Sequence, residues 1–165
     1  MASIPCYNIS IDNKETTHMT NTISNPTIEA LVPSWVEKYC DALTLNYKNY
    51  HVRSMQRMDA EGGSIYAKQQ LEAIKNDTAK LMKFRANEGK KYYKIIQQEA
   101  RNEAGEYQDQ SVCAFIDKKT GQIYKPAGWK APAKHVRFDM RIIAQRNFVH
   151  DANNVDWAGG HLYLR

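Results

Sequence analysis

The sequence has few of the features expected of a secreted or membrane protein. Its three cysteines, Cys6, Cys40 and Cys113, are odd in number and far apart, unlike the dense disulfide framework of small secreted chains. No apolar run approaches the roughly 20 residues that a membrane-spanning helix needs, and the first residues lack the basic and apolar segments of a signal peptide. We therefore expect free thiols in a reducing compartment and no membrane association.

Motifs that carry catalysis are also missing. The pairs Gly62-Gly63 and Gly159-Gly160 lack the lysine and the glycine spacing of a phosphate-binding loop, and no nucleophile elbow or kinase motif occurs. The five histidines show no metal-ligand spacing. The densest set of potential ligands is His150, Asp151, Asp156 and His161, which a polar loop near a terminus also produces. We expect no enzymatic activity, no cofactor and no bound metal.

The composition is that of one ordinary globular domain. The chain has 165 residues, of which 42% are hydrophobic and 25% charged, and a chain of this length can bury roughly 70% of its unfolded surface. We predict a flexible N-terminal arm over residues 1–25 and a single α+β domain over residues 26–165. Within the domain, residues 26–78 are predicted to be helical, residues 79–126 to form a sheet, and residues 127–165 to form a basic helix and a docked tail.

The helical part is indicated by caps and periodicity. Thr27 is a suitable N-cap, while Pro33 is expected to interrupt or restart the helix. An aromatic and apolar stripe recurs every four residues, at Trp35, Tyr39, Leu43 and Tyr47, which is typical of an amphipathic helix packed on a core. The segment 49–61 is ambiguous and ends at Gly62-Gly63. Ser64 then caps a second predicted helix that runs to about Asn76.

Two hairpins are predicted in the following segment. The first joins residues 81–86 to residues 92–99 through a turn at Gly89, and the polar stretch 100–110 is a loop or an extended hairpin end. The second turns at residues 117–121, with Gly121 in the left-handed region that glycine adopts without steric cost. The fold class is therefore α+β, with N-terminal helices packed on an antiparallel sheet of about four strands made of two hairpins.

A short basic helix is expected to follow the second hairpin. Pro132 can occupy its first turn, Val136, Met140 and Ile143 would share one face, and Lys134, Arg137 and Arg141 would share another. Trp157, Leu162, Tyr163 and Leu164 make the C-terminal tail unusually apolar. We expect this tail to dock on the sheet, because a free tail would leave these side chains in water.

Positive charge is concentrated in one stretch of the chain. Between Lys118 and Arg146 there are eight lysines and arginines and the single acid Asp139, so this stretch carries +7, while the rest of the chain carries −2 and the total is +5. Such a field attracts polyanions, although a solvated basic surface has the same composition. Tyr124 and Trp129 lie among the cations, and single-strand binders combine aromatic faces that stack on bases with cations that neutralise phosphates.

These residues form the predicted nucleic-acid site. Its members are Lys118, Lys119, Tyr124, Lys125, Trp129, Lys130, Lys134, Arg137, Arg141 and Arg146. One alternative is a buried Trp129 beside a solvated basic helix. Another is a pocket for a small nucleotide that uses Trp129, Arg137 and Arg141.

The second half of the chain, from about Gly89 to Arg165, resembles a family of small uncharacterised proteins of tailed phages and viral metagenomes. The resemblance is carried by Tyr124, Lys125, Pro126, Ala127, Trp129, Lys130, Pro132, Ala133, Lys134, Arg137, Tyr163, Leu164 and Arg165. It implies a virus-encoded protein that acts in the host cytoplasm or in a virion. We predict a non-enzymatic accessory protein that binds nucleic acid. The alternative is a minor virion component, or an inhibitor of a host defence factor, that works through a viral or host protein partner.

Overall fold

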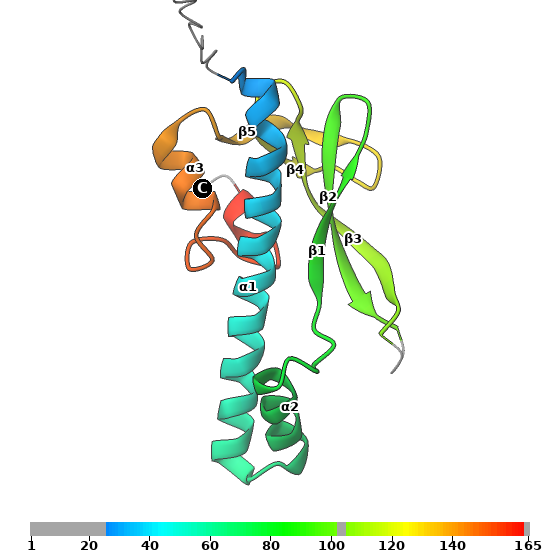
Figure 1. Ribbon diagram of the computed structural model, residues 1–165, viewed down its shortest axis with the longest axis vertical. Coiled ribbons are helices and arrows are strands. Elements are labelled where there is room, and N and C mark those ends of the chain that lie inside the picture. Colours follow the sequence, from blue (N-terminus) through cyan, green and yellow to red (C-terminus); the bar gives the residue numbers. More distant parts are fainter. Residues whose placement is uncertain (1–25, 102–104, 164–165) are drawn as a thin grey trace, which may run out of the picture.

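The computed structural model describes residues 26–101 and 105–163, and the predicted arm over residues 1–25 lies outside them. Two helices precede a meander of five strands, and a short helix and a 3-10 turn follow it (Figure 1). In chain order the elements are α1 (Ile28–Gly62), α2 (Ile65–Lys75), β1 (Lys83–Glu88), β2 (Tyr92–Ala100), β3 (Tyr107–Asp117), β4 (Gln122–Pro126), β5 (Pro132–Asp139), α3 (Ile143–Val149) and η1 (Gly160–Leu162). The α+β class predicted from the sequence is confirmed.

Helix α1 is continuous and absorbs the ambiguous segment 49–61. The Thr27 side chain accepts a hydrogen bond from the Ala30 N–H as N-cap. The expected interruption at Pro33 is wrong. A proline removes one helical hydrogen bond, but residues on both sides of it, including Val32 and Trp35, are buried in the core and hold the helix together.

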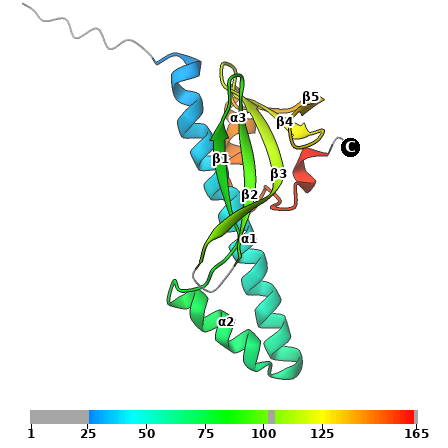
Figure 2. The same ribbon diagram turned by 90° about the vertical axis from the view of Figure 1, so that its right-hand side faces the viewer.

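The end of α1 and the beginning of α2 are as predicted. Helix α1 ends at Gly62. The next residue, Gly63, is the C-cap; it adopts a φ of 61° and donates its N–H to the Asp59 carbonyl. Ser64 then caps α2 through the Ala67 N–H. Helix α2 and the C-terminal half of α1 extend beyond the sheet (Figure 2). No helix in the described ranges is long and apolar enough to cross a bilayer.

The sheet is an antiparallel meander in the order β1-β2-β3-β4-β5, so it has one strand more than expected. The second hairpin forms as predicted, with Gly121 at φ 69° and its N–H bonded to the Asp117 carbonyl. The polar stretch 100–110 is only partly a loop, because β3 already begins at Tyr107.

The expected basic helix after Pro132 is wrong, because Pro132–Asp139 forms the edge strand β5. A proline is tolerated at the first residue of an edge strand. Pairing with β4 satisfies backbone hydrogen-bonding groups of this segment, whereas a short helix without such a partner is only marginally stable in water. A helix forms later, as α3, and it has only seven residues.

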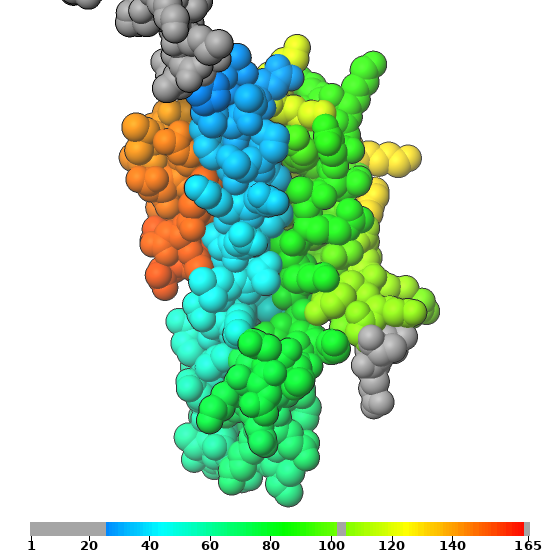
Figure 3. Space-filling model, in the orientation of Figure 1, coloured from blue at the N-terminus to red at the C-terminus, as the bar shows by residue number. Residues whose placement is uncertain are grey.

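The core lies between α1, one face of the sheet, α3 and the C-terminal segment. Tyr39, Leu43, Ile95, Ile116 and Ile123 are completely buried there, so the predicted stripe of α1 faces the core. The space-filling view shows α1 between the sheet and α3 (Figure 3). The tail docks in part: Leu162 is 1% exposed and Trp157 packs against the core, whereas Tyr163 is 61% exposed and Leu164 lies outside the described residues.

Candidate nucleic-acid interface

The structure disperses the predicted site residues over several surfaces. Arg146 points inward, where it donates to the Met140 carbonyl and stacks on Trp35 with its guanidinium carbon 4.8 Å from the ring centroid. Lys125 lies over the Tyr163 ring at 3.6 Å. Arg146 and Lys125 are therefore engaged in contacts within the protein and do not share a surface with Trp129.

Two further cations are paired with acids. Lys118 forms an ion pair with Glu88, and this contact raises the pKa of Lys118. Arg141 binds Asp139 in a bidentate ion pair, with Nη2 2.5 Å from Oδ2. Their positive charge is partly neutralised, which lowers what each contributes to a phosphate-binding surface.

The remaining predicted residues include the indole. Trp129 is 46% exposed, so the alternative of a buried indole is wrong. Lys119, Lys130 and Lys134 are also exposed. The predicted spacing of Lys134, Arg137 and Arg141 on one helix face does not exist, because Lys134 and Arg137 belong to β5 and Arg141 follows it.

Cross-strand register gathers a set of aromatic rings on the sheet face turned away from α1. Phe115 of β3 pairs with Lys94 of β2 and with Tyr124 of β4, while Tyr92 of β2 pairs with Asp117. Directly paired residues and their i+2 neighbours share one face. Ile95, which alternates with these residues, faces the core, so the aromatic residues lie on the opposite side.

The rings contact one another across the strands. Tyr92 meets both Phe115 and Tyr124 edge to face, with centroids 6.1 and 6.0 Å apart. Phe115 is 3% exposed and forms the floor of the cluster, whereas Tyr92 and Tyr124 are half-buried. Edge-to-face contact fixes the orientation of the two tyrosine rings, which leaves their outer parts available to a ligand.

Lys94 links this cluster to the indole. Its Nζ lies 5.9 Å from the Phe115 ring centroid and 5.2 Å from the Trp129 ring centroid. Trp129 sits in the turn between β4 and β5, which is closed by a bond from the Ala127 N–H to the Ala131 carbonyl. A cation at these distances is attracted to both rings, so Lys94 holds the turn over the sheet.

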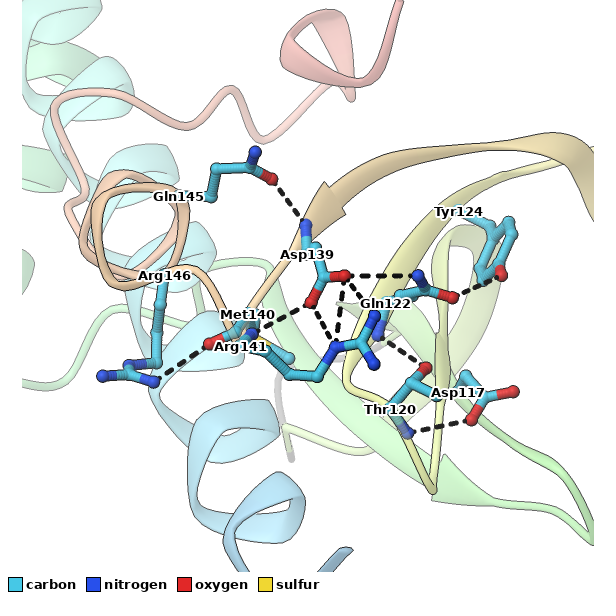
Figure 4. A network of polar contacts seen from close by, with 9 residues as sticks. All are labelled: Asp117, Thr120, Gln122, Tyr124, Asp139, Met140, Arg141, Gln145 and Arg146. Carbon is cyan, nitrogen blue, oxygen red and sulfur yellow. Dashed lines mark hydrogen bonds and ion pairs between the residues drawn. The ribbon is translucent and has the colours of Figure 1, made fainter. Parts of the chain in front are cut away.

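At the other end of the cluster a polar network anchors Tyr124 (Figure 4). The Tyr124 hydroxyl donates to Gln122 Oε1, and the Gln122 amide donates to Asp139. Hydrogen bonds from Arg141 lower the pKa of Asp139, so this carboxylate stays ionised. Gln145 accepts from the Asp139 backbone N–H, and the network therefore ties β4, β5 and α3 together.

We call this surface the aromatic-basic face. It consists of Lys91, Tyr92, Lys94, Tyr124, Trp129 and Arg141.

A lysine cleft adjoins this face at the end of the sheet. The β1–β2 turn supplies Lys90 and Lys91, the β3–β4 turn supplies Lys118 and Lys119, and the cavity has a volume of about 510 Å³. Lys91 belongs to both surfaces, since its Nζ is 5.1 Å from the Tyr92 ring centroid. Hydrogen bonding to Tyr92 raises the pKa of Lys91, which keeps the amine charged.

Acidic groups moderate the field of the lysine cleft. Glu29 and Asp117 line it beside the four lysines. The Asp117 carboxylate is buried and accepts the N–H groups of Lys119 and Thr120, as expected of an aspartate that begins a turn. The cleft therefore presents several lysines to solvent, while the Asp117 carboxylate is engaged in hydrogen bonds of the β3–β4 turn.

Sequence reasoning missed Lys91, Tyr92 and Lys94, half of the aromatic-basic face. The run Lys90-Lys91-Tyr92-Tyr93-Lys94 combines cations and rings, and strand alternation puts Tyr92 and Lys94 on one side. That signal was present, but the side facing solvent depended on the packing of α1.

Both aspartates of the predicted ligand set near the C-terminus, Asp151 and Asp156, form hydrogen bonds within their loops. Asp151 accepts from Asn153 and Asn154, and Asp156 accepts from the amides of Ala158 and Gly160. Within the described parts of the chain, no three His, Cys, Asp or Glu side chains are arranged to hold a metal ion.

A family model described as a family of unknown function (DUF7717) matches residues 14–164. No curated protein and no solved structure matches the chain.

Proposed function

We propose that this chain, which belongs to the DUF7717 family of unknown function, binds single-stranded nucleic acid on its aromatic-basic face. The observation that carries the proposal is the exposed Trp129 indole, held by Lys94 beside the ring pair Tyr92 and Tyr124. A base can stack on an aromatic face in a single strand, whereas the bases of a duplex are already stacked on each other.

The lysine cleft supports a path for the sugar-phosphate backbone. A strand whose bases contact Tyr92 and Trp129 would pass Lys91 and Lys94, with Lys119 at the cleft and Lys130 beside the indole. Contact with about four phosphates gives a slope of about −3 in a plot of log affinity against log salt concentration. The proposed role remains that of a virus-encoded accessory protein, as the resemblance of the second half implies.

Fluorescence anisotropy with a labelled oligothymidylate tests the proposal. We expect binding at low salt, weaker binding to a duplex of the same length, and the salt slope given above. Trp129→Ala should weaken binding by about 5- to 150-fold, because stacking contributes about 1–3 kcal/mol per base. Lys94→Gln should weaken it as well.

Lys75→Gln is the matched control for charge, because Lys75 is exposed on α2, away from the sheet. It should leave the affinity within about twofold. Absence of single-strand binding at low salt would refute the proposal, and so would equal losses in Lys94→Gln and Lys75→Gln.

A second candidate is contact with a protein partner, as expected for a minor virion component or an inhibitor. It is favoured by apolar side chains on the helical end: Ile65 is 75% exposed, Tyr66 54% and Tyr50 48%. Exposed apolar patches mark interaction sites. Mass spectrometry of purified particles tests the virion role, which a complete absence of this chain from particles would exclude.

A further inference from the structure

The pairing of β4 with β5 contains a bulge at Arg137. Ile123 pairs with Phe138, but Tyr124 pairs with Val136, so Arg137 is left without a cross-strand partner. A bulge bends the strand and redirects the side chain of the extra residue. The Arg137 side chain consequently lines a pocket formed with α3 and the C-terminal segment.

Two nitrogens of the Arg137 guanidinium lack acceptors. Its Nε and Nη1 atoms are buried and have no hydrogen-bond partner. In contrast, Arg85, Arg141 and Arg146 all donate to carboxylate or carbonyl oxygens. A buried charged donor without an acceptor is destabilising, so the arrangement favours an acceptor that a ligand brings.

The rest of the pocket limits which ligand fits. Its volume is about 590 Å³, within the range of small-molecule sites. His161 is not available as a second cation, because it accepts from the Asp156 N–H at Nδ1 and bonds the Tyr39 hydroxyl at Nε2. The Asp156 carboxylate is an acid of this wall, and its oxygens accept the Ala158 and Gly160 amides.

Aromatic rings form the apolar part of the same pocket. Phe148 stacks on Phe138 with ring centroids 5.4 Å apart and planes 18° apart. Phe148 is 37% exposed and Tyr163 is 61% exposed, and both line the pocket with Arg137. A flat ring can stack on such a surface, and an oxyanion can take the donors of a guanidinium.

We propose that this pocket binds a nucleoside monophosphate group, with its phosphate on Arg137 and its base against Phe148. The site is independent of the aromatic-basic face, since Phe138 pairs with the core residue Ile123 and the pocket therefore lies on the helix side of the sheet. The group is either a free nucleotide or the 5′ end of a strand, and the two sources share this chemistry.

Calorimetric titration with AMP and UMP tests the pocket in the full chain. We expect saturable binding of at least one nucleotide, and at least about tenfold weaker binding by inorganic phosphate and by the nucleosides. Arg137→Gln should weaken nucleotide binding about tenfold or more, because a hydrogen bond to a charged group contributes about 1.5–3 kcal/mol. Lys75→Gln removes an exposed cation from α2 and should leave binding unchanged.

Arg137→Lys is the second variant, in case the glutamine variant fails to fold. It keeps the charge but loses the planar fork, so nucleotide binding should still weaken. Failure of the wild-type chain to bind either nucleotide at millimolar concentration would overturn the proposal. Equal affinity for phosphate alone, or equal binding by the Arg137 variants, would overturn it too.

Two further experiments distinguish a free nucleotide from a strand end as the ligand, and the pocket from the aromatic-basic face as the site. Tighter binding of a 5′-phosphorylated dinucleotide than of its 5′-hydroxyl form, at an affinity above that of AMP, assigns the site to strand ends. The reverse order assigns it to free nucleotides. Trp129→Ala should leave AMP binding intact, so the pocket can stand if the aromatic-basic face fails, and the face can stand if the pocket fails.

Discussion

Protonation of His161 should destabilise the docked tail. The Asp156 backbone N–H donates to His161 Nδ1 at 3.1 Å, so the ring proton is on Nε2, where it is donated to the Tyr39 hydroxyl 2.8 Å away. A second proton on Nδ1 would face the Asp156 N–H, donor against donor. Burial, the largest cause, lowers the pKa of His161 from 6.5 to about 4.

The size of the effect follows from this pKa difference. The unfolded chain takes up the proton near pH 6.5 and the folded chain only near pH 4, so stability is lost as pH falls through this window. At 1.36 kcal/mol per unit, acidification from pH 7.5 to pH 4 should remove about 3 kcal/mol of unfolding free energy through this one group. Burial also lowers the pKa of His150, which adds a loss of the same sign.

Urea unfolding at several pH values isolates the contribution of His161. The variant His161→Gln keeps an amide that can bond to Tyr39 but cannot titrate. The stability difference between wild type and His161→Gln should shrink by about 3 kcal/mol between pH 7.5 and pH 4. His135→Gln, which removes an exposed imidazole from β5, is the matched control. If the wild-type and His161→Gln stabilities run parallel over this range, the reasoning is refuted.

Three further outcomes test the fold. Gly121→Val should cost about 2 kcal/mol or more, because φ is 69° and an added Cβ would lie 3.2 Å from Trp35 ring carbons; an unchanged melting temperature would contradict this. Thr27→Ala should lower the unfolding free energy by about 1 kcal/mol in chemical denaturation, because α1 loses its cap. Burial raises the pKa of both Cys40 and Cys113 to about 12, so a thiol reagent should modify them at pH 7 only as the chain unfolds. Rapid labelling of these two thiols in the folded chain would be the contrary result.

Local signals predicted much of the scaffold. Ser64 and Gly63 act on their own backbone neighbours, so their roles in ending α1 and beginning α2 can be recognised without knowledge of the fold. Gly121 likewise follows from the steric demand of its own turn. The stripe of α1 has a clear helical period, and any core would bury it.

Residues 132–139 show where local signals fail. Their apolar spacing also fits a helix, and only pairing with β4 made them a strand. The bulge at Arg137 arises from the same pairing, so no pattern within β5 could indicate that this side chain enters a pocket.

The sequence by itself determined that this chain is a basic α+β domain with capped helices, two hairpins and an apolar tail. Tertiary structure alone decided which cations face solvent: it turned Arg146 onto Trp35, paired Lys118 with Glu88, and brought Lys94 beneath Trp129. The physical reason is the separation along the sequence between the residues that interact. Caps and turns are satisfied within a few residues, whereas the surroundings of a charge depend on strands and helices that are distant in sequence.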